Sequence, residues 1–199
     1  MPSLAIKLAL VLLFSLPVQK EHFTEDELDL VRDAQELKDR VPVYFQLAER
    51  RLIILGVTDK SEKQKEKERK LQEQYEKDKK KAGPANAPSI KVPVDELAYL
   101  HDFTRAELLR GYTQALEEVM SNIDDNHERK LDVRDQLEAL EKFTRETMAL
   151  IEKYQPKNAS ERTALEEAIE KAKEANAGAK EAMKTIPKTE KKPAKPGGR

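Results

Sequence analysis

The 199-residue chain contains no cysteine, no tryptophan and only six glycines. The lack of cysteine excludes disulfide bonds, thiolate metal sites and a cysteine nucleophile. Six glycines leave little backbone to cradle a phosphate, and the sequence has no P-loop, no dinucleotide fingerprint and no G-x-S-x-G motif. We therefore predict a protein that is not an enzyme and that binds no cofactor.

Aromatic residues make up only 5% of the chain, whereas charged residues make up 38%. This balance favours long, solvated helices over a compact α/β enzyme. The hairpin pairs Asn-Gly and Asp-Gly are absent, and β-branched runs are few. The composition thus predicts an all-α protein. Its net charge of −1 supplies no overall positive field, so we expect no nucleic acid partner.

Charges of opposite sign are segregated along the chain. Acidic residues outnumber basic ones by ten to five in residues 21–59 and by fifteen to eight in residues 95–154. Basic residues outnumber acidic ones by ten to six in residues 60–81 and by five to one in residues 188–199. This pattern predicts an acidic body with two basic extensions that are suited to peripheral contact with anionic surfaces.

The first twenty residues have the pattern of an export signal. Lys7 precedes an apolar run from Leu8 to Leu16, and Pro17 follows the run. The run is too short to span a bilayer but suits the hydrophobic region of a signal peptide. We predict a signal peptide over residues 1–20 and export, to a bacterial periplasm or the extracellular space. No small-x-small triplet marks a cleavage site, so an uncleaved membrane anchor or a buried helix stays an alternative.

The first helix is predicted over residues 25–55. Thr24 and Glu27 match a capping box, in which each side chain satisfies a free backbone N–H group. Pro42 interrupts the helix, so we expect a kink, or a brief break with Pro42 near the start of a second helix. Gly56 predicts the C-terminal end of this helix. Apolar residues at steps of three and four form one stripe, which comprises Leu28, Val31, Ala34, Leu37, Val41, Phe45, Ala48, Leu52 and Leu55.

The next segment, residues 60–81, is predicted to be a charged helical arm. Leu71 and Tyr75 are its only sizeable apolar residues, so it cannot bury a face. Two interpretations stay open for it, a solubilising linker and a basic patch for anionic surfaces. Residues 82–94 contain three prolines and one glycine and are predicted to be a loop.

A single long helix is predicted over residues 95–154. From Tyr112 onward the apolar positions follow a heptad-like spacing, and the same register resumes beyond residues 122–131, which read NIDDNHERKL. We therefore favour a continuous helix in which Asn126 and Lys130 form a polar layer of the apolar seam. The alternative is a hairpin near Asp124–Asn126.

The last helix is predicted over residues 161–186, with Asn158 or Ser160 as its cap and Pro187 as its end. Residues 187–199 are rich in lysine, proline and glycine and are predicted to be a disordered basic tail. The whole, with residues 21–186 as its helical domain, is an all-α, elongated helical bundle or coiled-coil-like assembly. We expect three to four helices, with 25–55 and 161–186 packed against the long central helix.

Asp124 and His127 are the candidates for a metal site, because they have the i, i+3 spacing of a helical carboxylate–histidine pair. Di-metal sites in helical bundles need two such pairs and two further carboxylates from other helices, and the sequence contains no second pair. A solvated polar face is the simpler interpretation of these residues.

These observations lead to two hypotheses of function. We favour an exported, non-enzymatic interaction or scaffold protein of the cell envelope, which contacts an unidentified protein or envelope partner and can associate with itself through its seam. The alternative is a small-ligand or metal-binding bundle with its site near His101 or His127.

Overall fold

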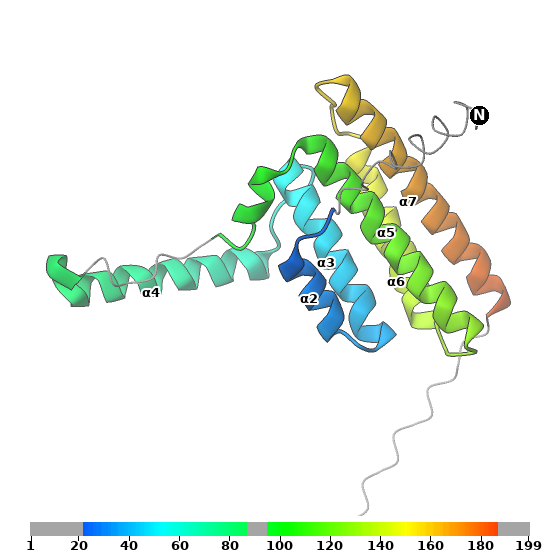
Figure 1. Cartoon of the computed structure of the whole chain (residues 1–199), viewed down its shortest axis with the longest axis horizontal. Coiled ribbons are helices and arrows are strands. Elements are labelled where there is room, and N and C mark those ends of the chain that lie inside the picture. Colours follow the sequence, from blue (N-terminus) through cyan, green and yellow to red (C-terminus); the bar gives the residue numbers. More distant parts are fainter. Residues whose placement is uncertain (1–21, 87–94, 187–199) are drawn as a thin grey trace, which may run out of the picture.

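A computed structural model describes residues 22–86 and 95–186 of the chain. Both ranges are helical and contain no strand, which confirms the all-α prediction. The predicted signal peptide and the predicted tail at 187–199 lie outside the described residues. The helices are α2 (Glu25–Asp33), α3 (Leu37–Leu55), α4 (Glu62–Asn86), the short 3-10 helix η3 (Ala98–Asp102), α5 (Arg105–Glu128), α6 (Arg134–Ile151) and α7 (Ala159–Thr185) (Figure 1).

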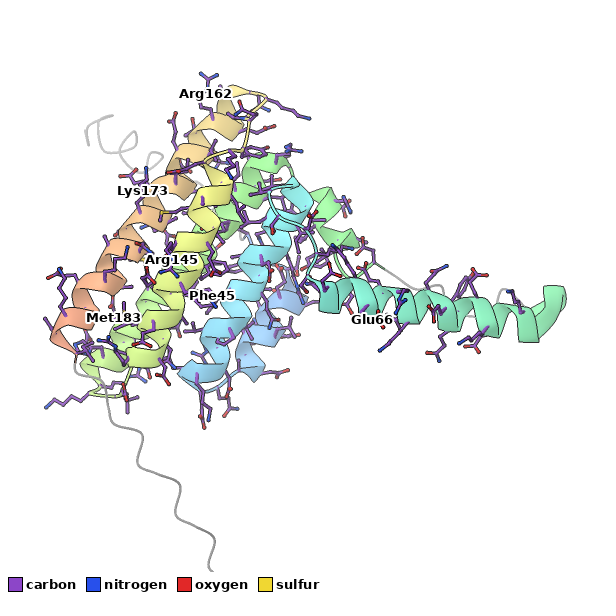
Figure 2. The ribbon with its side chains drawn as sticks, turned by 180° about the vertical axis from the view of Figure 1, so that it is seen from behind. Phe45, Glu66, Arg145, Arg162, Lys173 and Met183 are labelled. Atoms are coloured by element: carbon purple, nitrogen blue, oxygen red, sulfur yellow. The ribbon has the colours of Figure 1, made fainter. Side chains whose placement is uncertain are left out.

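Four helices enclose the core. Helix α3 packs against α5, α5 against α7, and α7 against α6. A looser contact between α6 and α3 closes the ring. There the ring of Phe45, which is labelled in Figure 2, stacks on the ring of Phe143 with the centroids 4.4 Å apart. Helices α5 and α6 follow each other in sequence but share few contacts, and α7 packs against both.

The prediction of one continuous helix over residues 95–154 is wrong. Helix α5 ends at Glu128, and the chain turns at 129–133 before α6 begins. In this turn Lys130 adopts a left-handed backbone conformation with φ of 62°, and the Leu131 N–H donates to the Asn126 carbonyl. The hairpin alternative was closer to the structure, although its proposed site, Asp124–Asn126, lies within α5.

Because this turn divides the segment into α5 and α6, the prediction of a long, coiled-coil-like central helix is not confirmed. The heptad spacing persisted because two antiparallel helices each bury a stripe of period 3.6 towards one core, and the two stripes happen to share a phase. The predicted polar layer is wrong for the same reason. Lys130 lies exposed in the turn, and the Asn126 amide donates to the Asn122 carbonyl at 2.7 Å.

The first predicted helix is divided as well. Its break falls at residues 34–36, and Pro42 lies in the second turn of α3, near the start of a second helix as one alternative proposed. Pro42 is exposed, so the helix tolerates the loss of one hydrogen bond there. The Thr24–Glu27 capping box is confirmed, and Gly56 ends α3 with a left-handed φ of 73°.

Helix α7 lies close to its predicted span and is capped by Asn158, whose side chain accepts from the Glu161 N–H at 2.9 Å. Its buried face is lined mainly by small residues, namely Ala164, Ala168, Ala172, Ala175 and Ala179. Small side chains let α7 approach both α5 and α6 closely, although each adds little buried apolar area.

A polar layer does exist in the core, but between other residues than predicted. The hydroxyls of Tyr112 and Thr147 are 2.8 Å apart, which links α5 to α6. The Asn176 amide donates to the Thr144 hydroxyl at 3.0 Å and to the Glu141 carbonyl at 2.9 Å, which links α7 to α6. These bonds satisfy the buried polar groups and fix the three helices in one register.

Candidate functional site

Among the described residues, Asp124 and His127 are not joined by a third side chain that would complete a metal site. Asp124 and His127 are exposed near the C-terminal end of α5, whereas His101 is exposed in η3, before the other end of α5. Within residues 22–86 and 95–186, no three histidine, aspartate or glutamate side chains are grouped so that they could hold a metal ion. Within the same ranges, each helix is too short or too polar to cross a membrane.

The strongest polar cluster, which the sequence did not indicate, is a buried ion pair. Arg51 of α3 and Glu27 of α2 have side chains that are each only 1% exposed. Arg51 donates from Nη1 to Glu27 Oε1 at 2.9 Å and from Nη2 to Glu27 Oε2 at 2.7 Å. It also donates to the carbonyls of Leu47 and His22. One guanidinium thereby fixes the first described residues to the core.

Neighbouring groups complete this cluster. The Tyr99 hydroxyl donates to Glu27 Oε1 at 2.7 Å, so η3 is held by the same carboxylate. Burial tends to raise the pKa of Glu27, but its bonds to Arg51 and Tyr99 and the positive charge of Arg51 outweigh this and hold the pKa below its ordinary value. Burial and the adjacent Glu27 raise the pKa of Tyr99 to about 12.

Two features of the sequence are consistent with this cluster in hindsight. Arg51 falls in phase with Val41, Tyr44, Ala48 and Leu55, all of which are buried. On the facing helix stands Gly111, where a Cβ atom would lie 2.2 Å from Arg51 Nε. An arginine at a core position and a glycine in mid-helix therefore mark one contact, but only the fold shows that they meet.

Helix α4 is the most exposed helix of the part of the chain that the structure describes. It projects from the bundle (Figure 1), and along it no residue with a described side chain is buried. The helix continues to Asn86, so the prediction of a loop is wrong for residues 82–86, while 87–94 lie outside the described residues. Its rise of about 1.5 Å per residue gives it a length of about 37 Å.

The base of this arm is tied by Lys60. Its ammonium group lies 2.6 Å from Glu68 Oε1 on α4 and 3.3 Å from Asp95 Oδ1, where the second described range begins. These contacts place the two ends of the segment 61–94 side by side. Further along α4, Arg69 pairs with Glu66 at 2.5 Å, but both side chains are largely exposed.

A partly open groove of about 610 Å³ runs between α5 and α7. Five glutamates line it, Glu117 and Glu118 from α5 and Glu167, Glu170 and Glu174 from α7. The basic residues in its lining are Arg110, Lys171 and His22, so with histidine counted as neutral this lining has a net charge of −3. The sequence could not indicate this groove, because α6 separates α5 from α7 along the chain and the two helices become neighbours only in the folded structure.

Internal ion pairs balance part of the charge in the groove. Lys171 Nζ lies 2.7 Å from Glu174 Oε2 and 3.4 Å from Glu117 Oε1. Arg110 Nε lies 3.8 Å from Glu167 Oε2. At the groove the side-chain oxygen of Gln114 is enclosed and has no hydrogen-bond partner among the described residues.

The bundle and the arm differ in charge as well as in exposure. Residues 22–59 and 95–186 together carry nineteen basic and thirty acidic residues, a net charge of −11. Residues 60–86 carry ten basic and six acidic residues, a net charge of +4. The acidic body and basic arm expected from the sequence are thus physically separate parts of the molecule.

Comparison with known proteins does not add to this account: no family model, no curated protein and no solved structure matches the chain significantly.

Proposed function

We propose that the protein is an exported, non-enzymatic scaffold protein of the cell envelope, in which the bundle is a rigid body and α4 is the contact element. The observation that carries this proposal is the projection of a 25-residue helix that buries none of its described side chains. Isolated helices of mixed charge gain little stability in water, since most helical stability in proteins comes from tertiary packing. Helix α4 does not gain this packing from the bundle, so we infer that it gains it by packing against a partner.

The chemistry of the arm indicates the kind of partner. Its net charge of +4 favours an acidic surface, and electrostatic attraction would speed the encounter and orient the arm. Its six acidic residues argue against a nucleic acid, where they would oppose the phosphate backbone. The export part of the proposal rests on the N-terminal sequence, with the uncleaved anchor as its alternative.

The buried ionic groups support a structural role rather than catalysis. Glu27 and Arg51 are saturated by each other and by backbone groups. Glu161 accepts from the Tyr154 hydroxyl and the Lys157 N–H, and its pKa is lowered chiefly by the latter bond. Each of these groups holds two segments of the fold together, and none of them lines the groove.

The proposal is tested by placing a photo-crosslinking amino acid at single exposed positions in intact cells. Gln74 on α4 is the test position, and Glu146 on α6 is the matched control. We expect discrete adducts from position 74 and few from position 146, and we expect high salt during irradiation to reduce them. Equal yields of the same adducts at both positions would show that α4 is not the contact element.

A further inference from the structure

We propose that the partner of α4 is a second copy of this chain, and that the arm of one molecule docks in the acidic groove between α5 and α7 of the next. This inference rests on the proposed function, because it names the partner of the same arm. It requires that the two surfaces be complementary, that they match in size, and that they be unable to meet within one molecule.

Complementarity comes from the register of the lysines. Positions 63, 67, 70, 77 and 81 are all lysine and follow steps of four, three, seven and four. At about 100° per residue these positions fall within about a quarter of the circumference of α4. These five lysine positions therefore share one side of the helical register of α4, and the groove lining has a net charge of −3.

The dimensions of the two surfaces also agree. On α5 the groove lining extends from Arg110 to Glu118, and on α7 from Glu167 to Glu174. At about 1.5 Å per residue the walls are about 10.5 Å long on α7 and about 12 Å long on α5. Positions 70 and 77 of α4 are about 10.5 Å apart along the helix axis by the same measure. Two lysines one heptad apart thus fit the length of the groove.

The geometry excludes closure within one molecule. Figure 1 shows α4 leaving the bundle beside α3 and η3 and pointing away from α5 and α7. An arm that docks elsewhere must use another copy, and the two surfaces in contact are different. Such a heterologous contact repeats from copy to copy and forms a chain or a closed ring. The seam first considered for self-association is instead buried within the bundle.

The strength of this contact follows from its chemistry. Charged side chains in water contribute up to about 1 kcal/mol per pair and are screened by salt. Lys171 and Arg110 already occupy some of the glutamates, so an incoming lysine must share or replace them. The association is therefore reversible, favoured by low ionic strength and high concentration, and suited to a scaffold that assembles locally.

Sedimentation velocity over a concentration series tests the proposal with the chain lacking residues 1–20. The arm variant is Lys70→Gln with Lys77→Gln, and the groove variant is Glu170→Gln with Glu174→Gln; all four side chains are exposed. The control is Asp135→Gln with Glu146→Gln on α6, at exposed positions outside the groove. We expect each test variant to associate about ten-fold more weakly than the unaltered chain, and the control to associate as the unaltered chain does.

A mixture of the two variants gives the decisive result. The unaltered arm of the groove variant can dock in the unaltered groove of the arm variant. The surfaces left over in such a pair are the altered groove and the altered arm, so no further molecule can be added. We expect an equimolar mixture to form 1:1 pairs and no larger species. The inference is overturned if the unaltered chain stays monomeric at low salt, if the groove variant associates normally, as pairing between arms would require, or if the mixture forms no pairs.

The outcomes for the two proposals are distinguishable. A monomeric chain whose position 74 still gives discrete adducts in cells would retain the scaffold proposal and discard the second copy as the partner. Self-association that persists without a contribution from α4 would discard the docking of α4, and the same adducts in equal yield from positions 74 and 146 would discard the scaffold proposal as well.

Discussion

Helices α4 and α7 have nearly the same length, 25 and 27 residues, yet only α7 belongs to the core. Both are rich in lysine and glutamate. Helix α7 carries a stripe of alanines and Leu165 that packs against two neighbours, whereas α4 has Leu71 and Tyr75 and no comparable stripe. The difference shows that a continuous apolar stripe, not length or helix propensity, decides which helix is buried.

The same contrast applies to ion pairs. Arg51 and Glu27 are buried, while Arg69 and Glu66 form a pair of similar length in water. Contacts that look alike should therefore differ greatly in their effect on stability.

Arg51→Ala should lower the free energy of unfolding by about 3 to 5 kcal/mol, because it leaves the Glu27 carboxylate buried without its partner. Arg69→Ala, the matched change on α4, should lower it by less than about 0.5 kcal/mol, since its partner stays solvated. Urea denaturation of both variants measures the difference. Similar losses in the two variants would mean that burial does not distinguish the pairs.

Gly111→Ala should lower the free energy of unfolding, whereas Gly178→Ala should raise it. At Gly111 a Cβ would meet Arg51 Nε at 2.2 Å and Cδ at 2.7 Å, and Arg51 is held by several hydrogen bonds. We expect a loss of about 1 to 3 kcal/mol there. At Gly178 nothing lies within 4 Å, so the helix should gain up to about 1 kcal/mol. Thermal unfolding compares them, and a gain at both positions would contradict the close contact with Arg51.

Alkaline pH should weaken the bundle through its buried tyrosines. Burial, followed by the adjacent Glu118, raises the pKa of Tyr44 to about 12 from an ordinary value of 10.0. Since the folded pKa is the higher one, the stability that this group contributes is complete below pH 10 and is lost as the pH rises towards 12. Tyr44→Phe should reduce that loss by on the order of 1 kcal/mol, measured as the free energy of unfolding against pH. An unchanged slope in the variant would exclude Tyr44 as a cause.

Gln72→Pro in α4 should have the smallest effect on the bundle. Proline in mid-helix costs about 3 kcal/mol of local helix stability, but the core does not depend on α4. We expect circular dichroism to show a loss of helix while the midpoint of thermal unfolding stays within about 2 °C, because the global ΔΔG is near zero. Met148→Pro in α6, by contrast, should prevent cooperative folding. A large fall in the midpoint for the α4 variant would show that the arm is part of the cooperative unit.

The sequence was sufficient to predict the features that depend on neighbouring residues. The Thr24–Glu27 capping box and the cap at Asn158, one of the two caps proposed, each rest on a side chain within a few positions of its backbone partner, and the end of α3 at Gly56 rests on a left-handed glycine backbone. The exposure of α4 was equally predictable from its missing stripe. In such cases the physical cause lies within one helical turn.

Other features could not be read from the sequence. The turn at 129–133 contains neither glycine nor proline, and its left-handed residue is Lys130, so the usual signals were missing. The bond from Tyr99 to Glu27 joins residues 72 positions apart. The groove between α5 and α7 likewise depends on which helices become neighbours. Tertiary packing decided these features, and local pattern did not encode it.

The short link between Lys60 and Asp95 has a practical consequence for protein engineering. Because Lys60 and Asp95 are in contact, the chain leaves the bundle and returns to it at a single point. The sequence between them, residues 61–94, can therefore be treated as an inserted cassette. The cassette can be excised and replaced by a few glycines, or exchanged for a longer helix with a longer return, while the rest of the chain keeps its fold. The reach of the molecule is then adjustable separately from its stability.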